Sequence, residues 1–135
     1  MKKVRRFIIG LLAFAVFIAA GLRLVGLKPY NIKTDSMEPT LSVNDMVYVE
    51  SVDFAYLQEG DIVTYVAGDN HTVTHRIKSV NRQDRTIITQ GDNNEYPDIE
   101  PVYAENIVGV VRFSIPQIGR LNDLSEKIKN LKGDA

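Results

Sequence analysis

The sequence contains no cysteine, and its two histidines are His71 and His75. Without cysteine the chain can form no disulfide scaffold, no thiol nucleophile and no zinc or iron–sulfur site built on thiolates. Two histidines are also too few for a histidine-rich metal site, so neither a metal nor a nucleotide cofactor is expected. The length of 135 residues allows one domain. With 44% hydrophobic and 24% charged residues, the composition differs from that of disordered or collagen-like chains.

Acidic residues are missing from the first part of the chain. Residues 1–27 carry five Lys and Arg and no Asp or Glu, whereas residues 28–135 carry 11 basic against 17 acidic residues. The net charge of -1 therefore combines +5 at the N-terminus with -6 in the body. Nucleic acid is not an expected partner, because its phosphates need a basic face on the protein.

Residues 7–27 form a run of 21 residues in which Arg23 carries the one charge. A helix needs about 20 apolar residues to cross ~30 Å of hydrocarbon, so this run predicts a single transmembrane anchor. The basic tail of residues 1–6 should stay in the cytoplasm, which leaves the body on the other side of the membrane. The alternative is a cleavable signal peptide, because the strictly uncharged run, residues 7–22, is short and residues 19–21 are small. Under both interpretations, residues 28–135 are exported across the membrane.

Residues 28–116 have the pattern of short strands, and we expect a mainly β, compact domain. Runs rich in β-branched and aromatic residues alternate with turn-forming Gly, Asn and Asp. The predicted strands are residues 46–49, 62–66, 73–80, 86–89 and 107–113.

Residues 117–135 change to a helical period. Leu121, Leu124, Ile128 and Leu131 recur at steps of three, four and three residues, which places them on one face of a short amphipathic helix. This C-terminal tail could rest against the domain, or it could lie on the membrane surface with its lysines near lipid phosphates.

Ser36 follows the predicted anchor closely and precedes Pro39 by three residues. The residue before a proline is kept out of the helical region, so the serine should sit in a turn. Such a turn could present its hydroxyl toward the bilayer, although most Ser-x-x-Pro segments are simply loops.

His75 lies within the predicted strand of residues 73–80. On a strand it shares one face with Val73 and Ile77, so it should point toward the interior. Lys78 is odd-spaced from His75 and should project from the opposite face. An inward histidine is often only a core residue, but a neutral imidazole is also suited to take a proton from a serine near neutral pH.

Asp92 and Asp98 belong to a polar stretch that begins with the turn-forming sequence Gly91–Asn94. Either carboxylate could accept the second ring N–H of His75 and fix its tautomer. The spacing alone does not decide between them.

Together these stretches resemble a type I signal peptidase, of the branch found in the endoplasmic reticulum, archaea and some spore-forming Gram-positive bacteria. The matching segments occur in the same order as in that family, after a predicted anchor that begins with basic residues. The similarity extends to about Gly119. The matching segments are Ser36-Met37-Glu38-Pro39-Thr40-Leu41, Gly60-Asp61-Ile62-Val63, Thr74-His75-Arg76-Ile77, and Gly91-Asp92-Asn93-Asn94 with Asp98.

The resemblance implies a role for each matching residue. Ser36 would be the nucleophile and His75 the general base, at the position where the usual bacterial branch has lysine. The third member of the family falls on Asp98, with Asp92 as an accessory acid. The family usually reads Ser-Gly-Ser before Met, whereas here Thr34 keeps a hydroxyl for oxyanion binding and Asp35 is unexpected. We expect Asp35 to face solvent.

The resemblance also implies a signal-peptidase-type β-domain that cuts preproteins after small residues, with Met37 and Ile32 as walls of its pockets. Expected partners are the lipid bilayer and signal peptides delivered by the secretion translocon, and the protein should be a monomer. A self-cleaving repressor-type protease would instead have a DNA-binding head and a lysine base. The alternative from another class is a non-enzymatic, membrane-anchored β-domain that binds a partner.

Overall fold

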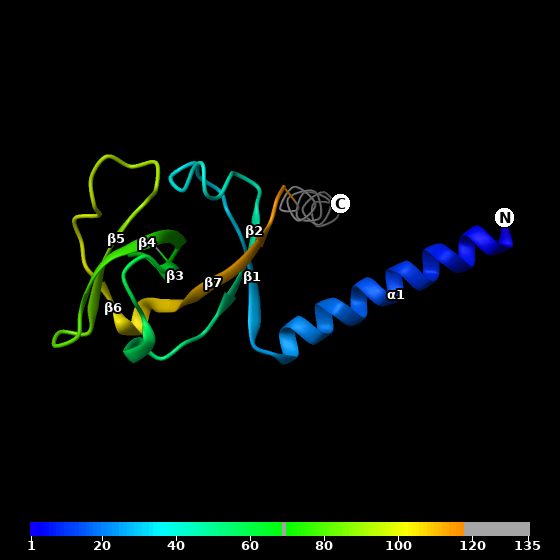
Figure 1. The fold of residues 1–135 in the computed structure, drawn as a ribbon, viewed down its shortest axis with the longest axis horizontal. Helices are drawn as coiled ribbons and strands as arrows, with labels where there is room; N and C mark the ends of the chain where they lie inside the picture. Colours follow the sequence, from blue (N-terminus) through cyan, green and yellow to red (C-terminus); the bar gives the residue numbers. More distant parts are fainter. Residues whose placement is uncertain (69, 118–135) are drawn as a thin grey trace, which may run out of the picture.

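The computed structural model describes residues 1–68 and 70–117. The chain starts with one long helix, α1 (Lys2–Leu24), which has no buried residue and projects away from the rest of the molecule (Figure 1). Within the described residues it is the one helix long and apolar enough to cross a membrane. It begins inside the predicted basic tail and ends three residues before Leu27, the predicted end of the anchor.

Between the helix and residue 117, the described part of the chain contains seven strands that form a single antiparallel sheet, which confirms the mainly β prediction. All five predicted strands are present. The sheet order is β1-β2-β7-β3-β4-β5-β6. The strand bounds are β1 (Leu27–Asn31), β2 (Met46–Glu50), β3 (Ile62–Val66), β4 (Thr72–Asn81), β5 (Thr86–Gln90), β6 (Val102–Tyr103) and β7 (Ile107–Ile115).

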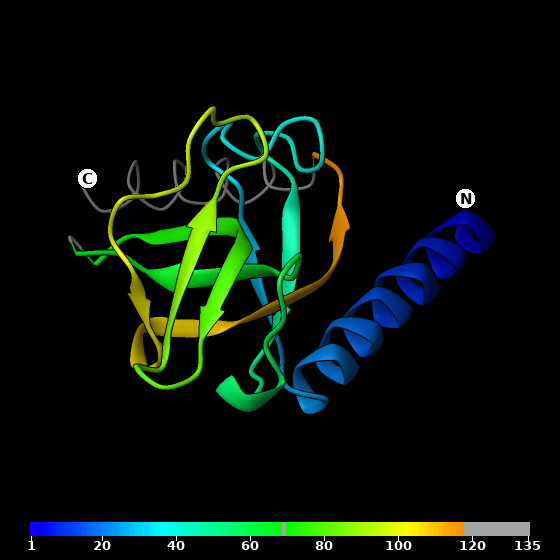
Figure 2. The same ribbon diagram turned by 60° about the vertical axis from the view of Figure 1, so that its left-hand side comes forward.

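The sheet curls on itself, as the turned view in Figure 2 shows. Register shifts interrupt the pairing of β2 with β7 at Tyr48/Val49, of β3 with β7 at Thr64/Tyr65, and of β4 with β5 at Ile77/Ser79. Such irregularities bend a strand and increase its twist. The bends allow one face of the sheet to enclose a core although its edge strands, β1 and β6, do not pair with each other.

Two groups of buried side chains fill the inside of the curled sheet. The larger one lies among β3, β4, β5 and β7 and includes Val63, Ile77 and Ile87. The smaller one joins Val47 and Val49 of β2 to the segment between β1 and β2. The segment that carries Ser36 therefore rests on the smaller core, whereas His75 belongs to a strand of the larger one.

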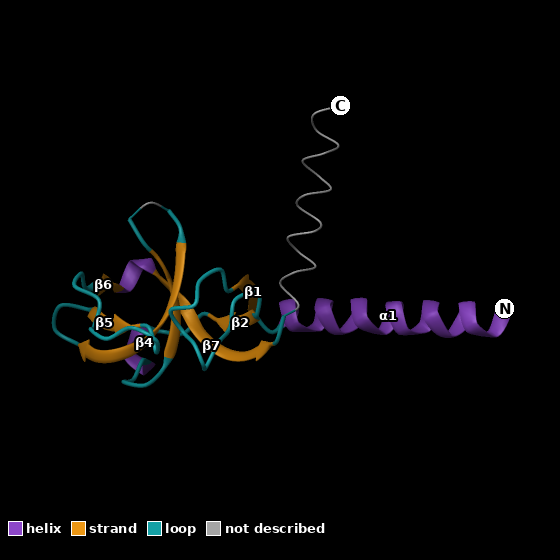
Figure 3. Cartoon of the chain, turned by 90° about the horizontal axis from the view of Figure 1, so that it is seen from above, coloured by secondary structure: helices purple, strands orange, loops and turns teal. Residues whose placement is uncertain are grey.

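Seen from above, the strands and their loops gather at one end of α1 (Figure 3). The predicted C-terminal helix falls on residues outside the described part of the chain, apart from Gln117 at its start. The N–H of Gln117 donates to the buried carboxylate of Asp45 over 3.0 Å, so the end of the described chain is fixed beside β2.

Candidate active site

Ser36 lies in a turn between β1 and β2, as its distance from Pro39 predicts. Its neighbour Met37 is 1% exposed, and Ile32 and Leu41 on either side are also buried in the smaller core. The three apolar side chains hold the turn on the sheet, because moving it would expose them to water. Ser36 itself is half-buried, so its hydroxyl lies at the surface of a fixed segment.

The loop after β5 fixes the same turn from the other side. The N–H of Asn93 donates to the carbonyl oxygen of Ser36 over 2.9 Å, and the Asn93 side chain donates to the carbonyl of Asp35. Gly91 is packed so closely that a Cβ atom there would lie 2.4 Å from the Ser36 carbonyl oxygen. A glycine is therefore needed where the loop meets the backbone of Ser36.

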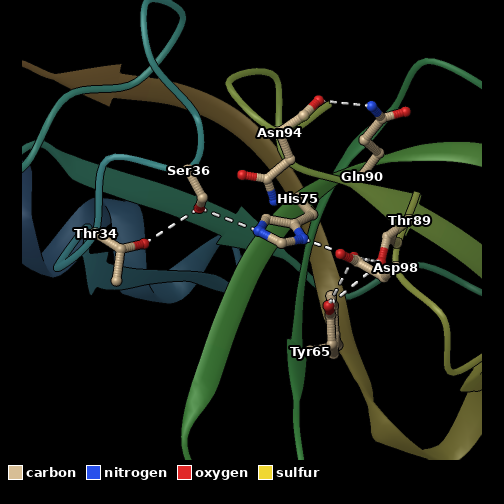
Figure 4. A network of polar contacts seen from close by, with 8 residues as sticks. All are labelled: Thr34, Ser36, Tyr65, His75, Thr89, Gln90, Asn94 and Asp98. Atoms are coloured by element: carbon tan, nitrogen blue, oxygen red, sulfur yellow. Dashed lines mark hydrogen bonds and ion pairs between the residues drawn. The ribbon is translucent and has the colours of Figure 1, made fainter. Parts of the chain in front are cut away.

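His75 projects from β4 toward Ser36 (Figure 4). It is 7% exposed, as its place on the inward strand face predicts, and it lies opposite Val63 of β3. Its Nε2 atom is 3.1 Å from Oγ of Ser36. The residues are 39 positions apart in sequence, so the sheet and the Ser36 turn together create this contact.

Asp98 contacts the other ring nitrogen of His75. Its Oδ2 atom is 2.7 Å from Nδ1, and its side chain is 25% exposed. A carboxylate can only accept, so the proton of a neutral imidazole lies on Nδ1. Nε2 then carries the lone pair that can accept the Ser36 hydroxyl proton, which is the arrangement a serine nucleophile requires.

Asp92 is placed apart from His75, on the opposite face of β4. Its carboxylate accepts two hydrogen bonds from Arg76, at 2.8 and 2.7 Å, and one from Thr40 at 2.5 Å. Arg76 also donates to the Gly60 carbonyl. The Arg76 hydrogen bonds hold the pKa of Asp92 below its usual value, and they raise the pKa of Arg76 in turn. The pair of Asp92 with Arg76 therefore links the segments around Thr40, Gly60 and Asp92, and Asp92 does not contact the imidazole.

Thr34 and Asp35, the two positions that depart from the usual family pattern, are both exposed but differ in their contacts with the site. The hydroxyl of Thr34 is 3.2 Å from Oγ of Ser36. Asp35 is exposed, as expected, and its carbonyl rather than its carboxylate joins the network. A hydroxyl therefore lies beside the candidate nucleophile.

A cavity of about 330 Å³ opens at Ser36 and His75. The Ser36 segment, with Ile32 and Met37, forms one wall, and residues 71–75 form another. β5 pairs with β4 from Arg76 onward, so the preceding residues of β4 have strand β3 on one edge and the cavity on the other. Lys78 is exposed on β4.

Two residues near Asp98 were not singled out from the sequence. Thr89 and Tyr65 both place their hydroxyl groups within 3.4 Å of Oδ2 of Asp98. Tyr65 lies two residues beyond Val63, which pairs with His75, so the strand register would have identified it. That register is not visible in the sequence alone. In residues 1–68 and 70–117, His, Cys, Asp and Glu form no group of three that could hold a metal.

A β-domain that follows a long apolar helix and brings a serine, a histidine and an aspartate into one hydrogen-bonded series has the architecture of a serine hydrolase. The model of the family "Signal peptidase, peptidase S26" matches residues 5–97, and the chain belongs to this family. The match includes Ser36 and His75 and ends one residue before Asp98.

Among curated proteins, the chain is similar to "Signal peptidase I W" of Bacillus subtilis (strain 168). The two are 35% identical over 80 residues, which cover 57% of this chain and 42% of the relative. The matched part of the chain thus spans about two fifths of the length of that relative.

Proposed function

We propose that the protein is a membrane-anchored serine endopeptidase that removes N-terminal signal peptides from exported preproteins. The series Ser36–His75–Asp98, with contacts of 3.1 and 2.7 Å, is the observation that supports this most directly. Membership of the signal peptidase family supports the choice of substrate.

In the first step Oγ of Ser36 attacks the carbonyl carbon of the scissile peptide bond. Nε2 of His75 takes the hydroxyl proton, while Asp98 stabilises the imidazolium through Nδ1. The tetrahedral intermediate then breaks its C–N bond, and His75 gives the proton to the leaving amine. Water, deprotonated by the same imidazole, hydrolyses the acyl-enzyme and restores the Ser36 hydroxyl.

The oxyanion that forms in this step needs hydrogen-bond donors near Oγ of Ser36. The Thr34 hydroxyl, 3.2 Å from that atom, is one candidate, and the backbone N–H of Ser36 is the other. Thr34 would have to turn its proton from Ser36 to the substrate oxygen. This rotation of a hydroxyl requires no backbone movement.

The substrate would bind in the cavity of about 330 Å³ as an extended segment beside the cavity edge of β4. Main-chain hydrogen bonds to that edge would supply affinity, and alternate side chains would enter pockets. Met37 and Ile32 line the cavity with apolar surface. We infer that they limit the pockets to small side chains, at the first and third positions before the cut.

Helix α1 would hold the β-domain at the membrane as a single-pass anchor. Its basic N-terminal residues would stay in the cytoplasm, and the catalytic domain would lie on the extracytoplasmic side. The preprotein would arrive from the secretion translocon with its signal sequence still in the bilayer. Anchoring the enzyme, which would act as a monomer, at the same depth raises the effective concentration of the cleavage site.

The experiment is cleavage of a preprotein with an Ala-x-Ala site by the full-length protein in detergent or liposomes. Ser36→Ala and His75→Ala should abolish cleavage. Lys78→Ala is the control on the same strand, and it should cleave like wild type because Lys78 is exposed on β4.

If Ser36→Ala still cleaves, the proposed nucleophile is wrong and the anchored, non-enzymatic β-domain becomes the better interpretation. If Lys78→Ala is inactive while His75→Ala cleaves, the general base has been misassigned.

A further inference from the structure

Thr89 lies on β5 directly behind Asp98 and is fully buried, with 0% of its surface exposed. Its hydroxyl donates a hydrogen bond to Oδ2 of Asp98 over 2.6 Å. Its carbonyl oxygen accepts the backbone N–H of Asp98 over 2.8 Å. One residue therefore holds both the backbone and the carboxylate of Asp98.

Tyr65 adds a second hydroxyl group to the same place, as Figure 4 shows. Its oxygen is 3.4 Å from Oδ2 of Asp98 and 3.3 Å from Oγ1 of Thr89. Each hydroxyl has one proton, so the short contact assigns the Thr89 proton to Asp98, and Tyr65 can donate to either neighbour. Burial, and the nearby charge of Asp98, raise the pKa of Tyr65, which keeps its phenol protonated near neutral pH.

The side-chain contacts of Asp98 with Thr89, Tyr65 and His75 all meet at one atom. Oδ2 of Asp98 is also the oxygen that lies 2.7 Å from Nδ1 of His75. A rotation of the carboxylate would therefore break its bonds to Thr89 and to His75 together.

The carboxylate of Asp98 could also rotate toward a second cavity. Together with Tyr65, Asp98 lines this cavity of about 620 Å³, which lies between the end of β3 and the segment 97–103. Water in that cavity could hydrate the carboxylate and draw it away from the imidazole. The hydrogen bond from Thr89 opposes this rotation.

We propose that Thr89 is a positioning residue, which keeps Oδ2 of Asp98 directed at His75, and that Tyr65 assists it. This inference rests on the proposed function. It adds that the rate of acyl transfer depends on a hydroxyl group that touches neither Ser36 nor the cavity in which the substrate would bind.

The test compares Thr89→Val, which removes the hydroxyl at nearly constant volume, with Thr89→Ser, which keeps it. Hydrogen bonds to charged groups are the strong ones, so kcat of Thr89→Val should fall roughly tenfold or more. KM should stay within about twofold, because Thr89 does not contact the cavity at Ser36. Thr89→Ser should keep most of the wild-type kcat.

Thr86→Val is the matched control, since Thr86 is also buried on β5 but pairs with Asn81 and Tyr103 at the other end of the strand. It should leave kcat and KM unchanged. The assays use the full-length protein in detergent with the Ala-x-Ala preprotein, and thermal unfolding is measured for every variant.

Tyr65→Phe provides a second test of the inference if Thr89→Val fails to fold, because it keeps the ring and removes only the hydroxyl. Its kcat should fall less, roughly two- to fivefold, since its contacts are longer.

Wild-type kcat in a folded Thr89→Val, an equal loss in Thr89→Ser, or a loss carried by KM would overturn the inference. So would wild-type kcat in Tyr65→Phe if that variant has to decide the question. A wild-type protein that does not cleave the preprotein would count against the proposed function itself, which is a distinct result.

Discussion

Asp98 binds Nδ1 of His75 over 2.7 Å, on the side of the imidazole that faces away from Ser36. The other candidate carboxylate, Asp92, instead forms a bidentate ion pair with Arg76 on the opposite face of β4. Two acids six residues apart in one loop therefore belong to different networks. We expect the first to determine the rate of catalysis and the second to determine the stability of the loops around it.

The variant Asp98→Asn tests the first role. An amide in place of the carboxylate would favour the wrong tautomer of His75, and it could not stabilise the imidazolium. We expect kcat to fall by at least about a hundredfold with little change in KM. Steady-state kinetics with the Ala-x-Ala preprotein measures both constants. Asp92→Asn is the matched control, and a larger loss of kcat in Asp92→Asn than in Asp98→Asn would reverse the assignment.

The pair of Asp92 with Arg76 should make stability depend on pH. The Arg76 hydrogen bonds lower the pKa of Asp92 in the folded protein, so the stabilisation is present above its unfolded pKa of about 4. It is lost as the pH falls through the lower, folded value. At pH 7 we expect Asp92→Asn to unfold with about 1–3 kcal/mol less free energy than wild type.

Thermal unfolding of wild type and Asp92→Asn between pH 7 and pH 3 measures this dependence. The two unfolding temperatures should differ at neutral pH and approach each other below about pH 4. A difference that stays constant over the whole range would show that ionisation of Asp92 does not contribute.

Gly91→Ala should disturb the site without removing any of its polar groups. The added Cβ would lie 2.4 Å from the Ser36 carbonyl oxygen, and this contact can be relieved only by moving the loop or the Ser36 turn. We expect a lower unfolding temperature and a several-fold or greater loss of kcat, because small displacements of reacting groups are costly. Gly68→Ala is the control, since a Cβ there meets no atom of the described residues beyond its chain neighbours within 4 Å. Equal behaviour of the two variants would contradict the close packing at Gly91.

Much of the sheet could be predicted because its strands are runs of β-branched and aromatic residues between turn-forming residues, and because residues 75–78 of β4 alternate between more and less buried positions. The pattern missed β1, since Lys28 and Pro29 resemble the exit from a membrane helix rather than a strand. A proline is tolerated there because β1 is an edge strand. It also missed β6, which has two residues and is too short to show any period.

The candidate site was predictable in part for a similar reason. The period of β4 points His75 inward whatever the rest of the fold does, and the proline after Ser36 marks a turn. The choice between Asp92 and Asp98 depends on how the loop after β5 folds back over β4. That path is set by contacts between distant segments, such as Asn93 with Ser36, and spacing along the chain does not reveal it.

Arg82 fastens the β4–β5 turn to the segment between β2 and β3, and its loss should weaken the fold far from the site. Its guanidinium donates to the carbonyl oxygens of Phe54, Ala55 and Leu57. Arg82→Met keeps the apolar stem and leaves these acceptors without the guanidinium, so we expect a loss of about 2–4 kcal/mol in the free energy of unfolding.

Arg85→Met is the matched control, because Arg85 also lies over the Phe54 ring, at 5.4 Å against 5.7 Å for Arg82. If the ring contact were the main interaction, both variants would lose the same small amount, about 0.5–1 kcal/mol. Denaturant unfolding in detergent distinguishes these outcomes, and kcat of the folded Arg82→Met should remain that of wild type.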